Sequence, residues 1–455
     1  MTNLINNATR LLFGALLLYS SMLYSKDVSS STFLFCLKPD ESTLSIEKTE
    51  ASFRTDNENL NQVLQNIGVV YIEEWIPNAT DRDRHGDIYL NRIYRVFLDG
   101  KSDVVSAMAM LRSQYSVLYA EHENVHYPHY TPNDPSYDQQ CSMSSVKADK
   151  AWDIWNIPEG IIPDGQEVLL ASVDTGVDYT HPDLKGSLWV NQAEMPDWSV
   201  EAGIDLDGDG YISSLEIEEF LIIEGMDNNA DGIVNLRDLV CEGSGFLDGV
   251  DADGNGYTDD IIGWDASGYY ANSPADPDPY PREDANPTGT WAHGTHVAGI
   301  LAATTDNGSG ISSTSYNAKI ISVKASRGSQ SSEPGVNDGY AGITYAAKAG
   351  YYSGTLTIIN NSWGGGSYSW SENTVIQNAH DTYGAIVLSS AGNGDTASGE
   401  YSKEYPAGYD NVLSVSAIGC SGAWGGWATY HETVDLAAPG ESILSTIIGL
   451  SLIHI

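Results

Sequence analysis

The pattern of apolar and polar positions changes character along the chain. Up to about residue 130, short strand-like runs are mixed with helical spacing, which predicts a small α+β domain over residues 31–130. A segment rich in Pro, Asn and Asp at 130–135 predicts a linker after it. The elements predicted in this first region are strands at 32–35 and 95–98 and a helix with Val104, Met108 and Leu111 on one face.

From about residue 146 onward, apolar runs typical of buried strands alternate with helix-like stretches. The predicted strands are 168–173, 318–323, 357–360 and 385–388, and the clearest helix is 339–350. Strands separated by helices indicate a parallel sheet. The fold class is therefore predicted as α/β, with a parallel-sheet core that follows an N-terminal α+β domain.

An acidic insertion interrupts this alternation at 196–290. It contains 23 Asp and Glu residues, only two Arg and no Lys. Three loops in it place oxygen ligands at alternate positions with Gly at the sixth, which is the EF-hand pattern for calcium. Their candidate ligands are Asp205, Asp207, Asp209 and Glu216, then Asp227, Asn229, Asp231 and Asp238, then Asp251, Asp253, Asn255 and Asp259. The alternatives are a solvated acidic face or, because the second loop resembles a dockerin repeat, a docking module for a scaffold partner.

Charge and composition exclude some partners. The 455 residues carry a net charge of −41, which would repel the phosphates of nucleic acids and of anionic membranes. Arg10 and the apolar run 11–19 indicate a cleaved export signal over residues 1–25, and a buried N-terminal helix is the alternative. No later segment has the length of a membrane anchor, so we expect a secreted, extracellular protein. The four cysteines allow three pairings, among which the sequence does not choose.

Two motifs carry the candidate catalytic groups. Asp174 follows a buried strand directly, and the carboxyl ends of parallel strands are where active sites of α/β proteins form. His293 begins the segment His-Gly-Thr-His-Val-Ala-Gly, whose small residues let a helix start close to neighbouring backbone. Either motif alone is a weak signal, but the two in this order favour a catalytic pair.

With these motifs the chain resembles the subtilisin-like serine proteases, the subtilases, over residues 130–446 apart from the insertion. Five segments carry the resemblance: 174–184, 293–299, 360–365, 389–393 and 434–440. The resemblance implies that Asp174 orients His293, that His293 is the base, and that Asn393 completes the oxyanion hole. It also implies that Ser362, Trp363 and Gly364 bind an extended protein or peptide substrate.

The nucleophile of this family is missing from the 455 residues. Subtilases carry it in Gly-Thr-Ser-Met-Ala beyond the Ala-Pro-Gly turn, and Ser442, Ser445 and Ser451 lack that motif. Residues 450–455 look like the translation of a sequencing adapter, so we expect a truncated chain with a peptidase domain at 131–449, incomplete at its C-terminus, and a non-native tail. The alternative is a degenerate, catalytically dead calcium-dependent binding protein. In either case we expect this chain to be inactive.

Two further assignments rest on the resemblance. Residues 117–125 resemble the end of a subtilase propeptide, which implies that the first domain is an intramolecular inhibitor and that the mature chain starts near 130–132; an unrelated N-terminal domain is the alternative. Asp134, Asp183 and Asn307 match calcium ligands of thermitase-like subtilases. Alternatively, Asp134 and Asn307 only cap turns.

Overall fold

The structure, a computed structural model, describes residues 28–48, 53–124, 130–155, 168–282, 287–331, 333–394, 403–424, 426–449 and 452–454. The predicted export signal at 1–25 lies outside these residues. The chain forms two compact units, Met1–Pro128 and His129–Ile455. Among the described helices, none combines the length and the apolar character needed to cross a membrane.

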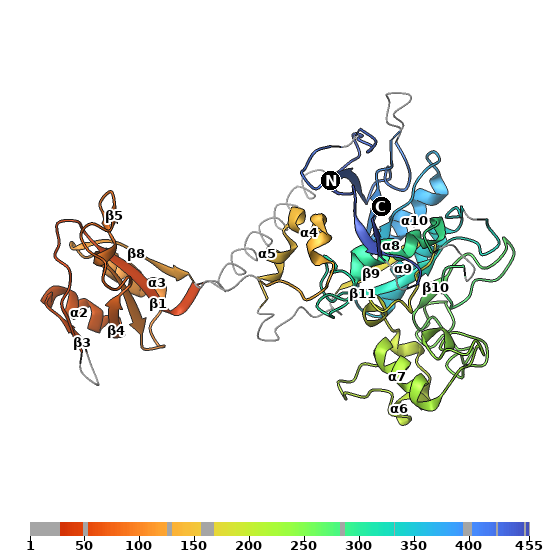
Figure 1. The fold of residues 1–455 in the computed structure, drawn as a ribbon, viewed down its shortest axis with the longest axis horizontal. Helices are drawn as coiled ribbons and strands as arrows, with labels where there is room; N and C mark the ends of the chain where they lie inside the picture. The colour runs from red at the N-terminus through yellow and green to blue at the C-terminus, as the bar shows by residue number, and fades with distance from the viewer. Residues whose placement is uncertain are drawn as a thin grey trace. The chain divides into compact units, whose positions relative to one another are not determined.

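The first unit is an antiparallel sheet with two helices packed on one face (Figure 1). Phe33, Phe35 and Leu37 share a core with both helices, whereas Leu34 and Cys36 point to the opposite side of the sheet. The predicted strands and helix are all present. The strands, in sheet order, are β4 (Val69–Glu74), β7 (Ile93–Leu98), β1 (Val28–Leu37) and β8 (Val117–Asn124), and the helices are α2 (Glu58–Asn66) and α3 (Val104–Arg112).

The second unit is built on a seven-stranded sheet in which every neighbouring pair of strands is parallel. The four strands predicted for this region are β9, β11, β12 and β13, whereas β10, β14 and β15 were not predicted. In sheet order the strands are β10 (Gly263–Asp265), β11 (Lys319–Lys324), β9 (Val168–Asp174), β12 (Leu356–Asn361), β13 (Ile386–Ser390), β14 (Val412–Ile418) and β15 (Leu436–Pro439).

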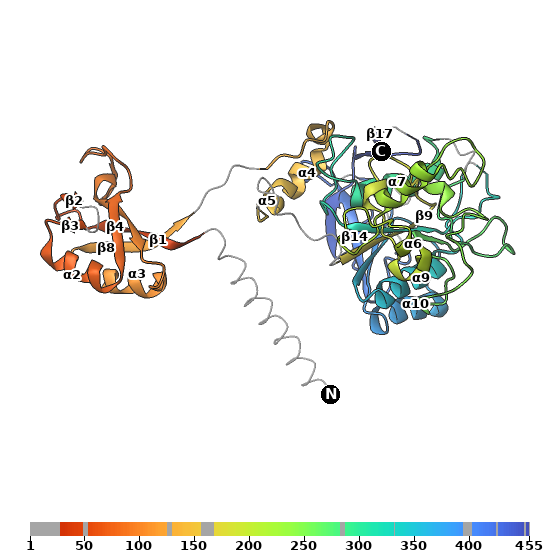
Figure 2. The same cartoon turned by 90° about the horizontal axis from the view of Figure 1, so that it is seen from below.

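Helices cover both faces of this sheet (Figures 1 and 2). The helix α9 (Gly339–Tyr352) packs against β9, the helix α10 (Trp370–Asp381) packs against α9 and β13, and both share a core cluster with Leu169, Ala171 and Val173 of β9. Leu170 packs instead with residues of α8 (His293–Ala302). Because successive side chains of a strand point to opposite faces, α8 lies on the face away from α9 and α10.

On the α8 side, a groove of about 570 Å³ runs beside strands β12–β15. Its lining is mainly apolar and includes Met143, Val146, Ile300, Leu388, Val415 and Leu436. Met143 and Val146 belong to the short helix α4 (Cys141–Val146), which a disulfide between Cys141 and Cys420 ties to the segment after β14. The two-stranded sheet of β16 (Leu444–Thr446) and β17 (Leu452–His454) follows β15.

The acidic segment 196–290 shares a core with the rest of the second unit. It contains α6 (Asp197–Glu201), α7 (Ser214–Glu224) and β10, which joins the main sheet. Its buried apolar side chains pack with those around β9, β11 and α8; the members from the segment include Ile217, Leu221, Leu236, Phe246 and Ile261. Most acidic residues of the segment lie at its surface, but Asp238, Asp260 and Asp265 are buried with its apolar residues.

Candidate active site

The structure brings Asp174 and His293 together. Asp174 is the last residue of β9 and is fully buried, and His293 is the first residue of α8 with about 40% of its side chain exposed. Nδ1 of His293 lies 2.8 Å from Oδ1 of Asp174, which also accepts a hydrogen bond from the backbone N–H of Thr175 at 2.8 Å. This geometry leaves Nε2 of the imidazole free of Asp174.

Two residues with small or polar side chains hold α8 against the end of β9. Thr175 Oγ1 donates to the carbonyl oxygen of Trp291 at 3.0 Å and accepts from the N–H of Gly294 at 3.0 Å. A Cβ on Gly294 would stand 2.3 Å from the carbonyl oxygen of Gly176, so only glycine permits this approach. The Gly after His293 is therefore needed to place the imidazole beside Asp174.

The carboxylate of Asp174 determines the titration of His293. Its negative charge raises the pKa of His293 above the ordinary value, against the opposing effect of burial, and the hydrogen bond adds to the rise. A folded-state pKa above the unfolded value means that the pair stabilises the fold most below about pH 6.5. That contribution is lost as the pH rises through the folded pKa.

Replacing Asp174 with Asn should lower the pKa of His293, because the opposite charge is removed while burial still disfavours the imidazolium. An NMR titration of the imidazole signals of wild type and variant measures the shift directly. Asp381, which contacts Nδ1 of the exposed His380 at 2.8 Å, offers the matched control, since Asp381→Asn should leave His293 unaffected. An unchanged pKa of His293 in Asp174→Asn would contradict the assignment.

The predicted substrate-binding and oxyanion residues follow the next two strands at the same edge of the sheet. Ser362, Trp363 and Gly364 come directly after β12, and Trp363 Nε1 donates to the carbonyl oxygen of Val173 at 2.8 Å. Asn393 follows β13 and its side chain is exposed. Because β9, β12 and β13 are parallel neighbours, the residues that follow them lie at the same edge of the sheet.

The side chain of Glu404, which the sequence did not single out, lies beside Gly364 and Gly392 at this edge of the sheet. A Cβ on Gly364 would stand 3.0 Å from its Oε2, and a Cβ on Gly392 would stand 2.7 Å from the same atom. The neighbouring Tyr405 pairs with Gly365 in an antiparallel bridge, which holds Glu404 beside the strand. Only this tertiary contact reveals the carboxylate, since no motif surrounds Glu404.

The predicted thermitase-like ligands also lie together. Asp134 and Asp183 are buried, and Asn307 donates from its amide to Oδ1 of Asp183 at 3.0 Å and from its backbone N–H to Oδ1 of Asp134 at 3.2 Å. Burial raises the pKa of Asp183 to about 6, and the charge of Asp134 adds to the rise. The segment of Asp134 was predicted as a linker, but the hydrogen bond from Asn307 shows that Asp134 belongs to the second unit. Two buried carboxylates with an amide between them suit a hard cation.

The first two acidic loops have the same internal arrangement. Oxygen atoms of Asp205, Asp207 and Asp209 lie within 4.8 Å of one another. In the second loop, Asp227 accepts from the N–H of Gly232 at 3.1 Å, as Asp205 accepts from that of Gly210 at 3.1 Å in the first. The helix α7 follows the first loop and precedes the second.

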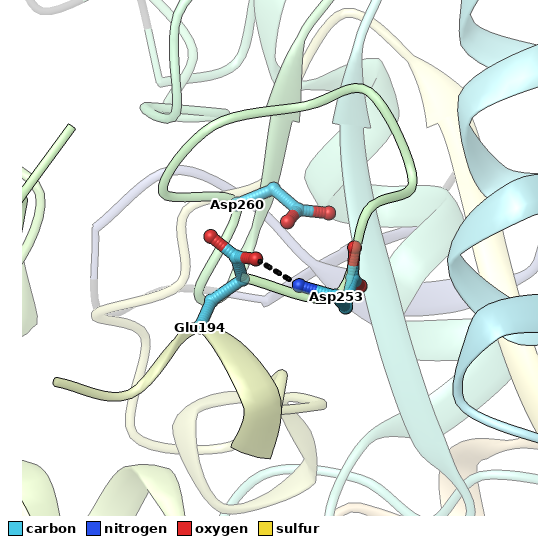
Figure 3. A group of neighbouring side chains, drawn as sticks. All are labelled: Glu194, Asp253 and Asp260. Atoms are coloured by element: carbon cyan, nitrogen blue, oxygen red, sulfur yellow. Dashed lines mark hydrogen bonds between the residues drawn. The ribbon is translucent and has the colours of Figure 1, made fainter. Parts of the chain in front are cut away.

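The third loop shares one contact with the other two loops and has two further carboxylates beside it. Asp251 accepts from the N–H of Gly256 at 3.0 Å, which matches the other two loops. Asp259, a predicted ligand, accepts from the backbone N–H groups of Asp248 and Gly249, at 2.9 and 3.1 Å. Glu194 and Asp260, which the sequence did not single out, lie beside Asp253 (Figure 3). Burial raises the pKa of Asp260 to about 8.

Comparison with known proteins gives a consistent result. Residues 165–453 match the family described as the Subtilase family. An extracellular basic protease of Dichelobacter nodosus is 30% identical over 351 residues, which cover 75% of this chain and 46% of that protein. Thermitase of Thermoactinomyces vulgaris is 26% identical over 324 residues, or 70% of this chain and 76% of thermitase. This chain thus spans about half the length of the Dichelobacter protein.

A solved structure of proteases from Pseudoalteromonas arctica PAMC 21717 is 22% identical and has a TM-score of 0.45, covering 72% of this chain and 82% of that one. The match to the Subtilase family extends over more than half of the 455 residues and includes Asp174, His293 and Asn393. The chain belongs to the subtilase family.

Proposed function

We propose that this chain is the precursor of a secreted, calcium-stabilised serine endopeptidase of the subtilisin type. The observation that carries the proposal is the 2.8 Å contact between Nδ1 of His293 and Oδ1 of the buried Asp174. A buried carboxylate in that position fixes the imidazole tautomer and stabilises the imidazolium. Protein and peptide chains are the proposed substrates.

The proposed mechanism assigns one role to each group. Nε2 of His293 takes the proton of a serine hydroxyl as the hydroxyl attacks the peptide carbonyl, and later returns it to the leaving amine. Asn393 donates to the oxyanion of the tetrahedral intermediate, an interaction worth about 3 kcal/mol in such sites. The backbone of Ser362 to Gly364 pairs with an extended substrate as an added strand would.

We infer that the serine belongs to a segment outside the 455 residues. The apolar groove beside β12–β15 supports this, because it also borders Ser362 and Ser390 at the edge where the candidate residues gather. Apolar side chains gain free energy when a helix covers them, at about 25 cal/mol per Å² of buried surface. A helix that carries the nucleophile would fill this groove and place its serine near His293.

The chain as written should hydrolyse no peptide, because it lacks a serine in the family motif. The measurement is turnover of a fluorogenic peptide by the purified 455-residue chain, with and without phenylmethylsulfonyl fluoride. A secreted subtilisin assayed in parallel shows that the substrate and buffer are suitable. Turnover that the inhibitor abolishes would mean that another serine, such as Ser442 or Ser445, serves as the nucleophile.

The rival function is a catalytically dead, calcium-dependent binding protein on the same fold. The missing serine motif is the observation that favours it. Reading the gene beyond codon 449 distinguishes the two: Gly-Thr-Ser-Met-Ala in frame supports the peptidase, and a stop codon or an unrelated sequence supports the binding protein. A pull-down with and without calcium tests whether the acidic loops instead dock to a scaffold partner.

We infer further that the first unit is an intramolecular inhibitor that is removed after export. Two observations support this inference. The first unit has an α+β fold, and its last strand, β8, covers the segment that resembles the end of a propeptide. N-terminal sequencing of the protein recovered from culture medium tests both steps. A start after residue 25 supports the export signal, and a start near 130–132 supports removal of the first unit.

A further inference from the structure

Glu404 places a carboxylate between the ends of the two strands that lead into the proposed substrate site. Gly364 follows β12, and Gly392 follows β13, its parallel neighbour in the sheet. A Cβ on Gly364 would stand 3.0 Å from Oε2 of Glu404, and a Cβ on Gly392 would stand 2.7 and 2.8 Å from Oε2 and Oε1. The carboxylate therefore lies against the backbone of both glycines, in space that any other residue at either position would partly fill.

The carboxylate of Glu404 has no cation of its own. In the part of the chain that the structure describes, no Lys, Arg or His side chain forms an ion pair with it, and it accepts no hydrogen bond. The neighbouring Lys403 lies elsewhere, with its Nζ 5.8 Å from the centre of the Tyr405 ring. Glu404 is half-buried and both of its oxygens are open to solvent. A partly desolvated carboxylate attracts a cation more strongly than one in bulk water, so this group is available to a cationic ligand.

The fold holds the backbone of Glu404 without using its side chain. Tyr405 pairs with Gly365 through two backbone hydrogen bonds of 3.1 and 3.3 Å. The carbonyl oxygen of Glu404 accepts from the N–H of Gly408 at 2.8 Å. Because the carboxylate adds no hydrogen bond to this framework, removing its charge should leave the fold intact.

The proposed mechanism places this carboxylate relative to the reacting carbonyl. Gly392 directly precedes Asn393, the proposed donor to the oxyanion, and Gly364 ends the segment proposed to pair with the substrate backbone. The oxyanion forms on the carbonyl of the substrate residue whose bond is cleaved. The side chain of that residue branches from the carbon next to this carbonyl. Glu404 therefore lies where that side chain would be received.

We propose that Glu404 makes the peptidase selective for lysine or arginine at the substrate residue whose carbonyl is attacked. An ammonium or guanidinium group there donates charge-assisted hydrogen bonds to the carboxylate, and the planar guanidinium can use both oxygens at once. A neutral side chain gains no such interaction, and an acidic one is repelled. The inference rests on the proposed peptidase function and deepens it by naming the substrate class.

The test uses the protein expressed from the complete gene and two fluorogenic peptides that differ only at the residue before the cleaved bond. One peptide carries arginine there and the other citrulline, which has nearly the same shape without the charge. Wild type should show a kcat/KM for the arginine peptide that is about tenfold to a hundredfold higher, as expected of hydrogen bonds between charged groups. Glu404→Gln should bring the two values together by lowering the arginine value and leaving the citrulline value unchanged.

Two further variants make the result specific. Glu201→Gln, at an exposed position of α6, removes the same charge elsewhere and should keep the wild-type preference. It separates a local contact from the general attraction that a net charge of −41 exerts on cationic peptides. Glu404→Lys reverses the charge and should favour a glutamate peptide over its glutamine counterpart. Thermal melts of all variants show whether they fold as wild type does.

The outcomes for selectivity and for catalysis are distinct. Equal cleavage of both peptides by wild type, or a preference that Glu404→Gln leaves unchanged, would overturn the inference and leave the peptidase function standing. If neither peptide is cleaved, the peptidase function fails, and calorimetric binding of the same two peptides to the same protein decides the inference. Tighter binding of the arginine peptide by wild type but not by Glu404→Gln supports it, and equal binding or no binding overturns it.

Discussion

Replacing His293 with Ala should lower kcat roughly a millionfold in a protease that carries its serine segment, the loss expected when a subtilisin loses its base. The reason is geometric, since His293 contacts the buried Asp174 at the edge of the sheet where the proposed substrate-binding residues and Asn393 also lie. Without a base, the serine hydroxyl keeps its proton and is a poor nucleophile. The measurement is kcat and KM for a peptide substrate with the protein expressed from the complete gene.

The chain offers a matched control for this substitution. His380 on α10 contacts Asp381 through the same Nδ1 to Oδ1 pair at 2.8 Å, but both side chains are largely exposed. His380→Ala should therefore leave kcat unchanged. Rates close to wild type in His293→Ala would remove His293 from the mechanism, and an equal loss in both variants would point to general damage of the fold.

Most of the sheet could be predicted from sequence because its central strands are continuous apolar runs. β9 and β11 are buried on both faces over most of their length, and β12 and β13 are buried on one face and mostly half-buried on the other, which produces the runs that the sequence shows. β10 and β15 are only three and four residues long, and β14 alternates Ser with apolar residues. Sheet pairing rather than local preference makes these three segments strands, so local patterns could not predict them.

The contact between Asp174 and His293 could be predicted because each residue lies in a short motif whose small residues have a steric purpose, as Gly294 shows. Glu194 and Glu404 lie outside the motifs of the sequence, and tertiary contacts bring them to their places. The third loop ends on the apolar Ile262, where the first two end on Glu216 and Asp238, and Glu194 accepts the loop's backbone hydrogen bonds instead.

The acidic segment was predicted from its charge as an insertion between two core motifs. Most of its acidic residues lie at the surface, whereas its apolar residues, such as Ile217 and Phe246, share a core cluster with Val177 and with Ala298 of α8. Loss of order in this segment would therefore disturb that core. Calcium bound to its loops would stabilise the second unit through this connection.

Removing calcium should lower the melting temperature of the protein and expose residues 196–290 to proteolytic cleavage before the rest of the second unit. Each ion that binds only the folded chain stabilises it by about 2.7 kcal/mol when free calcium is a hundred times the dissociation constant. For a unit of this size, that corresponds to a fall of about 4 °C for each ion removed. Without the ions, the carboxylates of the three loops repel one another at short range.

A thermal melt and a limited digestion, each with calcium or with chelator, measure the two effects. The control is chelator already saturated with calcium, which should behave as calcium alone does. Early cuts should fall in the exposed loops near Asp207 and Asp231, because these lie farther from the sheet pairing that protects β10. A melting temperature that chelation leaves unchanged, an uncut segment and no binding heat would leave the carboxylates as a solvated surface, stabilised by their backbone hydrogen bonds alone.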